Sequence, residues 1–459
     1  MTRTSVGDTD HDRRYGSGAI ALICIITFVS VLLYGAVDSG TLVILALFSV
    51  LLLVYWISVS LKQRSLTISA DIIQIPLVAL LAFGFVQLIP IGSSSEASLP
   101  VQVSTSLSLD PYATRFFVCR LFLCLIFFAA ALTFTNTLPR LRTVAFVFII
   151  FFSLLAFFSI LQRVEDPSSI YGLRQPAQAI PFGTFINRHH FAALMEMILG
   201  LSLGILFSGG LSPNRWPFIA AASIVMAIAI FLTGSRGGLI GLVASLIAIA
   251  VFTAYGSRGK RSGGEMRSIS PKLILAAGAG FLIVTIGLVS FLGGTDPLLR
   301  STGLTSGAGD FSSGRTEFWR TAIKIFLDHP VAGVGLDSFG VAYSMYDKTS
   351  GLFRVEQAHN DYLQILADAG VLGFACVAGF ILLLLKNGLR TIRSASSGIR
   401  RGIAIGALAG CVAIMVHSFF DFPLRTPANA FVFLTLAAMC VVKIPEGEGK
   451  RRSRRRKET

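Results

Sequence analysis

The sequence contains few charged residues: Asp, Glu, Lys and Arg together make up only 14% of its 459 positions. A soluble globular chain usually carries about 25%. Hydrophobic residues make up 54% of the chain, and the mean hydropathy is +0.74. This balance excludes an ordinary soluble domain and predicts an integral membrane protein.

Cysteine and histidine are also few, with six of each. All six cysteines lie in apolar runs, and their spacing matches neither a disulfide framework nor a zinc site. The Asp8–Asp12 segment contains three acidic residues and one histidine, but we expect it to be a solvated tail. The sequence therefore predicts no metal site and no cofactor.

Apolar runs recur along the chain that are long enough to cross a bilayer, which takes about 20 residues in a helix. We predict twelve spans, although glycines in the second half leave eleven or thirteen open. The spans lie near Gly18–Val37, Thr41–Leu61, Ile72–Ile91, Phe116–Phe134, Val144–Leu161, Phe191–Phe207, Trp216–Leu232, Gly238–Tyr255, Leu273–Leu292, Val371–Leu385, Ile403–Phe419 and Asn429–Val442. The expected fold class is an all-α integral membrane protein with about 12 transmembrane helices.

The predicted spans divide the chain into five parts. These are a tail at 1–17, spans one to nine at 18–292, a long polar loop at 293–370, spans ten to twelve at 371–443, and a basic tail at 444–459. Lys and Arg are concentrated in the short loops of one side, which is typical of the cytoplasmic side. This prediction places both termini in the cytoplasm and the polar loop outside. Six basic residues in the loop run against the rule, but long loops largely escape it.

The formal net charge of +15 at first suggests a nucleic-acid partner. However, the basic residues are spread over short loops and the C-terminal tail, as membrane insertion requires, and no basic domain is present to hold a duplex. We therefore expect no nucleic-acid binding, although the tail could contact anionic membrane lipids.

Two arginines stand out on the outward side of the predicted topology. Arg236 lies in a glycine-flanked turn between two spans, and Arg315 opens an amphipathic helix in the polar loop. A guanidinium group binds phosphate oxygens through two parallel hydrogen bonds, and a helix start attracts anions. Both arginines are candidate phosphate ligands, although Arg236 could instead anchor the membrane surface and Arg315 could form a structural ion pair. The neighbouring Phe318 and Trp319 are expected to be packing residues.

His359 lies near the start of another predicted helix, with Leu363 and Leu366 on one face. An imidazole titrates near neutrality and can accept a proton from a hydroxyl group. A lone histidine is more often a structural residue, so the pattern alone leaves both roles open. Asp361 and Asp368 follow on the same helix and are expected to be solvated or to cap it.

Arg120 and Glu196 lie inside predicted spans, where a charge is costly unless it is paired or functional. They would suit the pathway of a transporter or a flippase of lipid-linked sugars, which is the alternative function from another class. Transporters often consist of two related halves, and this chain shows no such repeat. Glu196 is otherwise expected to pair with an arginine inside the bundle.

Five segments, taken in order, resemble the O-antigen ligase and O-antigen polymerase superfamily of the Wzy-C type. They are Gly183–Asn187, Thr233–Gly237, Gly314-Arg315 with Phe318-Trp319, Asp328–Pro330, and His359-Asn360 followed by Gly370 and Gly373. The resemblance is strongest from Phe182 to Gly373, whereas the first five spans match only as generic helices.

The resemblance implies a metal-independent, inverting glycosyltransferase with a GT-C-like fold in the cell inner membrane. Its donor would be a glycan on undecaprenyl diphosphate, used at the periplasmic face. The acceptor hydroxyl group would belong to lipid A core, to a lipid-linked repeat or to a protein. These acceptors correspond to a ligase, to a polymerase of O-antigen or exopolysaccharide, and to a protein glycosyltransferase, and the sequence leaves all three open.

The resemblance also assigns roles to individual residues. His359 matches the proposed catalytic base of the family, and Arg236 and Arg315 match its diphosphate-binding arginines. The sequence departs from the family at Arg188-His189-His190, where relatives often carry a second asparagine. Further candidates for contacting the acceptor or supporting the catalytic groups are Asn187, Arg188, Asn360 and Arg425.

Overall fold

The computed structural model of the protein describes residues 6–90, 106–177, 179–257, 270–293, 314–347 and 355–444. The basic tail after residue 444 and parts of the polar loop at 293–370 lie outside these residues. The described α-helices are α1 (Val6–Leu32), α2 (Ser39–Gln63), α3 (Ile75–Gln87), α4 (Pro111–Phe134), α5 (Leu138–Glu165), α6 (Arg188–Leu206), α7 (Trp216–Thr233), α8 (Arg236–Ser257), α9 (Pro271–Gly293), α11 (Arg315–Asp328), α12 (Phe339–Tyr346), α13 (Asp361–Ser394), α14 (Gly398–His417) and α15 (Pro427–Val441). Three short 3-10 helices, η1 (Tyr34–Ala36), η2 (Ile72–Gln74) and η3 (Pro423–Arg425), complete the set.

The helices confirm the predicted fold class, because the protein is an all-α, multi-pass membrane protein. Ten of the described helices are long and apolar enough to cross a membrane. Two further apolar helices, Ile72–Gln87 and α15, coincide with predicted spans but are shorter, so the count of twelve remains a prediction. α1 begins at Val6 and therefore continues well into the stretch that the sequence predicted as a tail.

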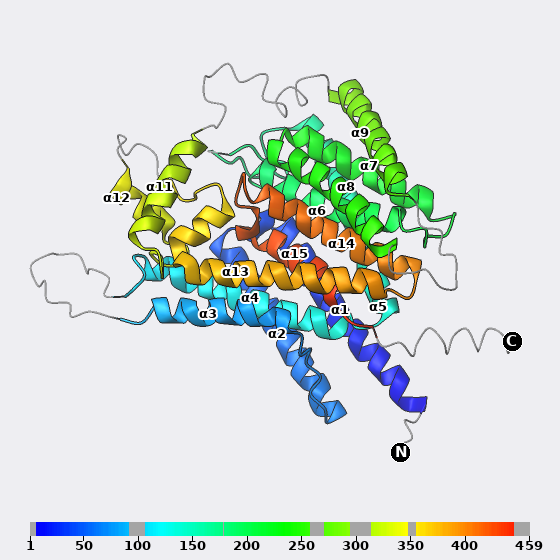
Figure 1. Cartoon of the computed structure of the whole chain (residues 1–459), viewed down its shortest axis with the longest axis horizontal. Coiled ribbons are helices and arrows are strands. Elements are labelled where there is room, and N and C mark those ends of the chain that lie inside the picture. The colour runs from blue at the N-terminus through cyan, green and yellow to red at the C-terminus, as the bar shows by residue number, and fades with distance from the viewer. Residues whose placement is uncertain are drawn as a thin grey trace, which may run out of the picture.

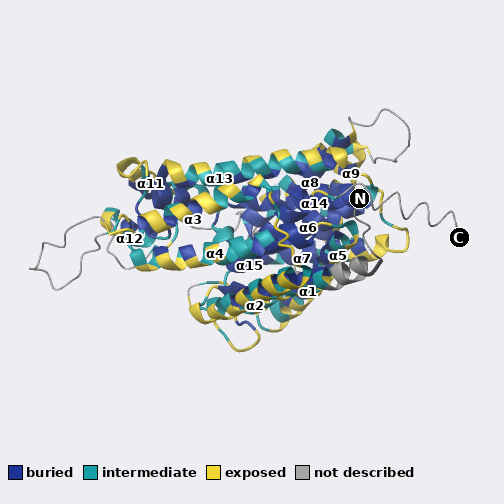
Figure 2. Ribbon diagram, turned by 90° about the horizontal axis from the view of Figure 1, so that it is seen from below, coloured by how far each residue is buried: buried dark blue, intermediate teal, exposed yellow. Residues whose placement is uncertain are grey.

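The centre of the bundle is formed by α6 and α14, whose spans are almost completely buried, whereas α2 and α9 expose most of theirs. Figure 2 shows this contrast between dark and yellow ribbon. Glycines let the two central helices approach closely: a Cβ on Gly204 would lie 2.2 Å from the Cα of Gly406, and one on Gly200 would lie 2.8 Å from the amide nitrogen of Gly410. Small residues four apart are a common contact between membrane helices.

Helices α11 and α12 form a cap at the end of the bundle where α13 begins (Figure 1). They share a small hydrophobic core with the start of α13, which includes Ile325, Phe339 and Ala367. α11 carries the helix predicted to open at Arg315, and α13 carries the helix predicted to follow His359. Both sequence predictions are therefore confirmed at these helix starts.

A sharp kink in α13 attaches the cap to the bundle. Gly370 has φ +60° and ψ −159°, a conformation that only glycine adopts readily. The kink frees the backbone amide of Val371 to donate to the carbonyl oxygen of Pro330 at 2.8 Å. A Cβ on Gly370 would lie 2.4 Å from the carbonyl oxygen of Val331. Two segments of the sequence resemblance, Asp328–Pro330 and Gly370, therefore meet in one backbone contact.

Candidate functional site

His359 stands at a bend directly before α13. Its φ of +51° lies in the left-handed region, which costs a non-glycine residue about 1–2 kcal/mol. Asn360 then caps the helix, because its side-chain oxygen accepts hydrogen bonds from the amides of Tyr362 and Leu363 at 3.0 and 3.1 Å. The bend and the cap fix the position of the imidazole. Asn360, a predicted candidate for contacting the acceptor, is buried and has this capping role.

Asp421 connects His359 and Arg315. The Nδ1 atom of His359 lies 3.2 Å from one carboxylate oxygen of Asp421, and a terminal nitrogen of Arg315 lies 3.5 Å from the other. The Asp421 side chain is 2% exposed, whereas His359 and Arg315 are 31% and 25% exposed. A buried acid therefore holds two basic side chains whose outer edges remain accessible.

The ionisation of Asp421 sets the roles of the imidazole nitrogens. Burial raises the pKa of Asp421, but the hydrogen bond from His359 and the neighbouring imidazoles of His189 and His190 lower it, and the pKa lies well below the usual range. An ionised Asp421 accepts a hydrogen bond from Nδ1–H of His359, which leaves Nε2 as the proton acceptor. This is the arrangement that a general base requires.

Aromatic side chains enclose the imidazole on two sides. The Phe318 ring stacks on His359 with 5.8 Å between ring centroids, and the Phe422 ring meets it edge-on at 4.9 Å. Phe318 also packs against the hydrophobic core of the cap, in agreement with the packing role expected for it. These rings restrict the imidazole to the plane in which it meets Asp421.

The turn that carries Arg236 is held by the start of α6. Gly234 ends α7 with φ +62°, and the hydroxyl group of Ser235 lies 2.9 Å from Nδ1 of His189. A Cβ on Gly237 would lie 2.5 Å from the imidazole ring of His417. Arg236 is half-buried. The turn that carries it packs on His417, the last residue of α14, and Asp421 follows His417 by four residues.

Asn187 and His190 organise the same end of the bundle. Asn187 caps α6 through a hydrogen bond from the His189 amide at 2.9 Å. His190 is buried, with Nδ1 2.8 Å from the Thr426 hydroxyl group and its ring edge-on to Phe422 at 4.8 Å. Asn187 thus has a capping role, and the structure places the side chain of the candidate Arg188 in a half-buried position beside it.

Glu196 has a different partner from the one expected. It lies 3.1 Å from Nδ1 of His417, and both side chains are buried. The sequence expectation that Glu196 pairs with an arginine is therefore wrong. The absence of side chains at Gly237 and Gly241 of α8 makes room for this pair, since a Cβ on Gly241 would lie 2.3 Å from the Glu196 carboxylate.

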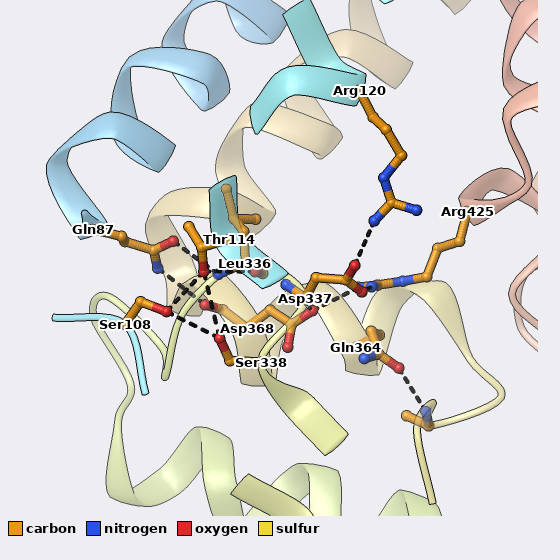
Figure 3. Close-up of polar contacts among 11 residues, drawn as sticks. Gln87, Ser108, Thr114, Arg120, Leu336, Asp337, Ser338, Gln364, Asp368 and Arg425 are labelled. Carbon is orange, nitrogen blue, oxygen red and sulfur yellow. Dashed lines mark hydrogen bonds and ion pairs between the residues drawn. The ribbon is translucent and has the colours of Figure 1, made fainter. Parts of the chain in front are cut away.

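Arg425 belongs to a second charged cluster, which Figure 3 shows. It contacts Asp337 of the cap and donates to Asp368 of α13 at 2.6 Å. Arg120 of α4 also pairs with Asp337. Asp368 is fully buried, so the expectation that it is solvated or caps a helix is wrong. The ion pair with Arg425 explains how a carboxylate can be buried there.

A glutamine reinforces the attachment of the cap beside this cluster. The Gln87 amide group donates to the carbonyl oxygens of Ala332 and Asp368 at 2.8 and 3.0 Å, and its oxygen accepts from the Leu336 amide at 2.9 Å. Figure 3 shows Gln87 reaching from α3 into the loop. The loop before α12 is therefore held by side chains from three spans.

Asp421 is the residue of the cluster with His359 and Arg315 that the sequence did not single out. It stands between Phe420 and Phe422, in the segment between the eleventh and twelfth predicted spans, where the sequence analysis named only Arg425. The sequence signal for Asp421 was that of an acidic residue between two aromatic residues at the end of an apolar run. Only the fold shows that it meets His359, 62 positions away in the sequence.

The fold and the site together define a class: a multi-pass membrane protein with a His–Asp–Arg cluster at one end of its bundle. Residues 221–378 match the family model Wzy_C, described as O-antigen ligase. This match supports the resemblance to the O-antigen ligase (Wzy-C) superfamily that the sequence indicates. It includes Arg236, Arg315 and His359. A comparison with curated proteins found no match.

The match supports an O-antigen ligase-type function in envelope polysaccharide synthesis. It indicates a glycosyltransferase-like enzyme whose substrates are, in broad terms, lipid-linked glycans and lipid A core acceptors. Within the described residues, no group of three or more His, Cys, Asp or Glu side chains is arranged to hold a metal ion.

Proposed function

We propose that the protein transfers a glycan from undecaprenyl diphosphate to an acceptor hydroxyl group at the periplasmic face of the inner membrane. The observation that carries this proposal is the contact of His359 and Arg315 with the two oxygens of Asp421. In this proposal, the proton acceptor His359 and the phosphate ligand Arg315 share one buried carboxylate. The family match supports the same reaction class.

In the proposed reaction, Nε2 of His359 takes the proton of the acceptor hydroxyl group while its oxygen attacks the anomeric carbon. The bond between that carbon and the diphosphate oxygen breaks, and undecaprenyl diphosphate leaves with the electron pair. A single displacement inverts the anomeric carbon. Asp421 stabilises the imidazolium ion that forms, as an acid paired with a catalytic histidine does.

Arg315 and Arg236 neutralise the charge on the departing diphosphate. Among the described residues, Arg315 has one carboxylate partner, Asp421, and its remaining N–H groups can donate to phosphate oxygens. Its position at the first residue of α11 adds the backbone amides of a helix start, which also attract an anion. Stabilisation of a leaving group by fixed charges is often the largest catalytic contribution.

The orientation in the membrane can be tested directly. We expect a cysteine introduced at Thr316, which is exposed on α11, to react with a membrane-impermeant thiol reagent in intact spheroplasts. A cysteine at Ser396, exposed between α13 and α14, should react only after the membrane is permeabilised. Labelling of Ser396 but not of Thr316 in intact spheroplasts would place the cluster in the cytoplasm and refute the proposed reaction.

The envelope polysaccharide of a deletion strain distinguishes the three acceptors. Loss of all long chains from lipid A core indicates a ligase, whereas single repeats still attached to the core indicate a polymerase of O-antigen. Unchanged lipopolysaccharide with lost exopolysaccharide indicates an exopolysaccharide polymerase. Unchanged polysaccharides together with lost glycoprotein staining indicate a protein glycosyltransferase. A strain that keeps every surface glycan unchanged would contradict the proposed function.

A further inference from the structure

Two neighbouring arginines near the start of α14, Arg400 and Arg401, are both buried. The guanidinium group of Arg400 donates to the carbonyl oxygens of Met439 and Val442 at 2.9 and 2.7 Å, so it satisfies the end of α15. In Arg401, by contrast, Nε and one terminal nitrogen are buried without a hydrogen-bond partner among the described residues. A charged group buried in this way loses its hydration without compensation. The fold therefore explains the burial of Arg400 but not that of Arg401.

Arg401 lies where three helices meet, at the end of the bundle opposite the cap. Figure 1 shows α13 running from the cap along the bundle to this end. A Cβ on Gly256 of α8 would lie 3.0 Å from a methyl group of Ile392 of α13 and 3.8 Å from Cδ of Arg401. Beside this α8–α13–α14 junction, the guanidinium group of Arg393 lies 3.7 Å from the centroid of the Tyr255 ring. Two guanidinium groups are thus gathered at one junction.

The junction carries positive charge without a matching acid. Neither α8 nor the stretch 371–418 contains an acidic residue, and that stretch contains the basic residues Lys386, Arg390, Arg393, Arg400 and Arg401. Asp71 of the neighbouring η2 segment already accepts from the Asn387 amide group at 3.3 Å and from the backbone amide of Ile73 at 3.1 Å. Helix ends attract cations, which accounts for arginines at the end of α13 but supplies no acceptor to Arg401. The described residues at this junction therefore leave room for an external anion.

An apolar stripe on α8 leads to the junction along the membrane. Val243, Ile247 and Val251 are 45%, 52% and 56% exposed, and together with Tyr255 they recur every four residues, which places them on one face of a helix. Val243 and Tyr255 are 12 positions apart (255 − 243), a rise of about 18 Å, and the hydrocarbon of one leaflet is about 15 Å thick. A lipid beside this face has its chains along the stripe and its head group near Tyr255, where aromatic residues of membrane proteins meet the interface.

We propose that the α8–α13–α14 junction binds the phosphate group of an anionic phospholipid through Arg401 and Arg393. Guanidinium groups donate paired hydrogen bonds to phosphate oxygens, and basic pockets between membrane helices suit anionic head groups. The exposed Arg393 and the 8% of Arg401 that stays exposed give a head group access. A zwitterionic lipid fits less well, because its ammonium group would lie among arginines.

This inference goes beyond the proposed function, because the junction lies at the opposite end of the bundle from His359. In the proposed topology the lipid belongs to the cytoplasmic leaflet. The measurements that test it record lipid binding and thermal stability of the purified full chain, and none of them requires glycosyl transfer. Their outcome is therefore independent of whether the proposed reaction is correct.

The first test compares melting temperatures in nanodiscs of phosphatidylcholine with and without phosphatidylglycerol. We expect phosphatidylglycerol to raise the melting temperature of the wild type. Arg401→Leu should melt no lower than the wild type in phosphatidylcholine, because it removes a buried charge that has no partner, and phosphatidylglycerol should raise its melting temperature less. The matched control is Arg400→Gln. It should melt lower in both lipids and keep the full increase, because its partners are carbonyl oxygens of the protein.

The second test measures the affinity of the detergent-solubilised chain for phosphatidylglycerol by native mass spectrometry. Arg401→Gln and Arg393→Gln should each bind the lipid roughly tenfold more weakly, the effect of one charged contact. The matched control is Arg215→Gln. Arg215 is an exposed arginine just before α7, and it lies 5.6 Å from the ring centroid of Phe146. This variant should bind as the wild type does.

Inorganic phosphate separates a lipid head group from a free anion as the ligand. We expect phosphate at the concentration of the lipid to displace none of the bound phosphatidylglycerol. Displacement at equal concentration would show a site for free phosphate and overturn the inference. Equal binding of phosphatidylcholine and phosphatidylglycerol, an equal loss of affinity in Arg215→Gln, or a lower melting temperature of Arg401→Leu in both lipids would overturn it as well.

Discussion

Two clusters of charged side chains lie at the end of the bundle where α13 begins, and they differ in how their charges are balanced. Asp421 is the acid for both His359 and Arg315, so basic groups outnumber acids there. In the other cluster, Arg120 and Arg425 face Asp337 and Asp368, and the numbers are equal. The first cluster therefore has two basic residues and one acidic residue, whereas the second has two of each.

The difference teaches where a ligand can add to the protein and where it must compete. An anion at the first cluster can bind N–H groups of Arg315, because that side chain is 25% exposed. An anion at the second cluster must replace a carboxylate that is already present. The first cluster is thus suited to binding an anion, whereas the second attaches the cap to the bundle.

The largest effect should follow from removing His359, the proposed general base of the first cluster. We expect His359→Ala to lower turnover by roughly 10²–10⁴-fold, the usual contribution of an acid–base group. Expression and donor binding should remain nearly intact, because His359 is partly exposed and caps no helix itself. Turnover of a lipid-linked donor by the purified protein is the measurement.

The matched control for this change is His329→Ala, because His329 is exposed on the cap. We expect its effect to be mild, and that of His189→Ala to be intermediate, since His189 holds the turn of Arg236. If His359→Ala is stably inserted and still turns over at a near-normal rate, His359 is only a helix-start contact.

Removal of the shared acid should have the next largest effect. Asp421→Asn retains the shape but removes the charge that stabilises the imidazolium ion and holds Arg315, so turnover should fall, although by less than in His359→Ala. The control is Asp328→Asn, an exposed acid of α11 that accepts from the Tyr346 hydroxyl group at 2.6 Å. An equal loss in both variants would show a general effect on the cap.

The pKa of Asp421 also predicts a dependence of stability on pH. Because the folded-state pKa lies below the usual range, the ion pairs of Asp421 contribute stability above its unfolded pKa of about 3.9. This contribution is lost as pH falls from there toward the folded pKa. The melting temperature of the wild type should therefore fall more on acidification than that of Asp421→Asn. An equal fall in both proteins would contradict this prediction.

Much of the fold follows from the sequence, because apolar runs and helix starts are local signals. The starts of α8, α11 and α13 beside Arg236, Arg315 and His359 were all predicted from glycine, charge and periodicity. Pairings between distant segments are not local, and three were missed or mistaken. Asp421 was not singled out, Glu196 was given the wrong kind of partner, and Asp368 was expected to be solvated or to cap the helix.

These errors have a common physical cause. Whether an acid is solvated or buried depends on which basic group the fold brings to it, and this cannot be read from hydropathy. Asp368 is fully buried on α13, and only the approach of Arg425, 57 positions later, offsets the cost of burying its charge. The same argument applies to Glu196 and His417, which are 221 positions apart.

A smaller effect should follow when the geometry of the arginines changes but their charge does not. Arg315→Lys and Arg236→Lys lose the planar pair of donors that suits phosphate oxygens, and we expect turnover to fall about 10-fold or more in each. Arg320→Lys is the matched control, because Arg320 is exposed on α11 with its side chain 70% exposed. Full activity in both variants would show that the arginines act only as point charges or not at all.

The smallest effect, no change at all, is expected from removal of divalent ions. In the proposed reaction Arg236 and Arg315 supply the positive charge that a metal ion supplies to the leaving diphosphate in other phosphate-transferring sites. Turnover of the purified protein in excess EDTA should therefore equal turnover in magnesium. A metal-dependent reaction would lose its activity in EDTA and regain it with magnesium or manganese.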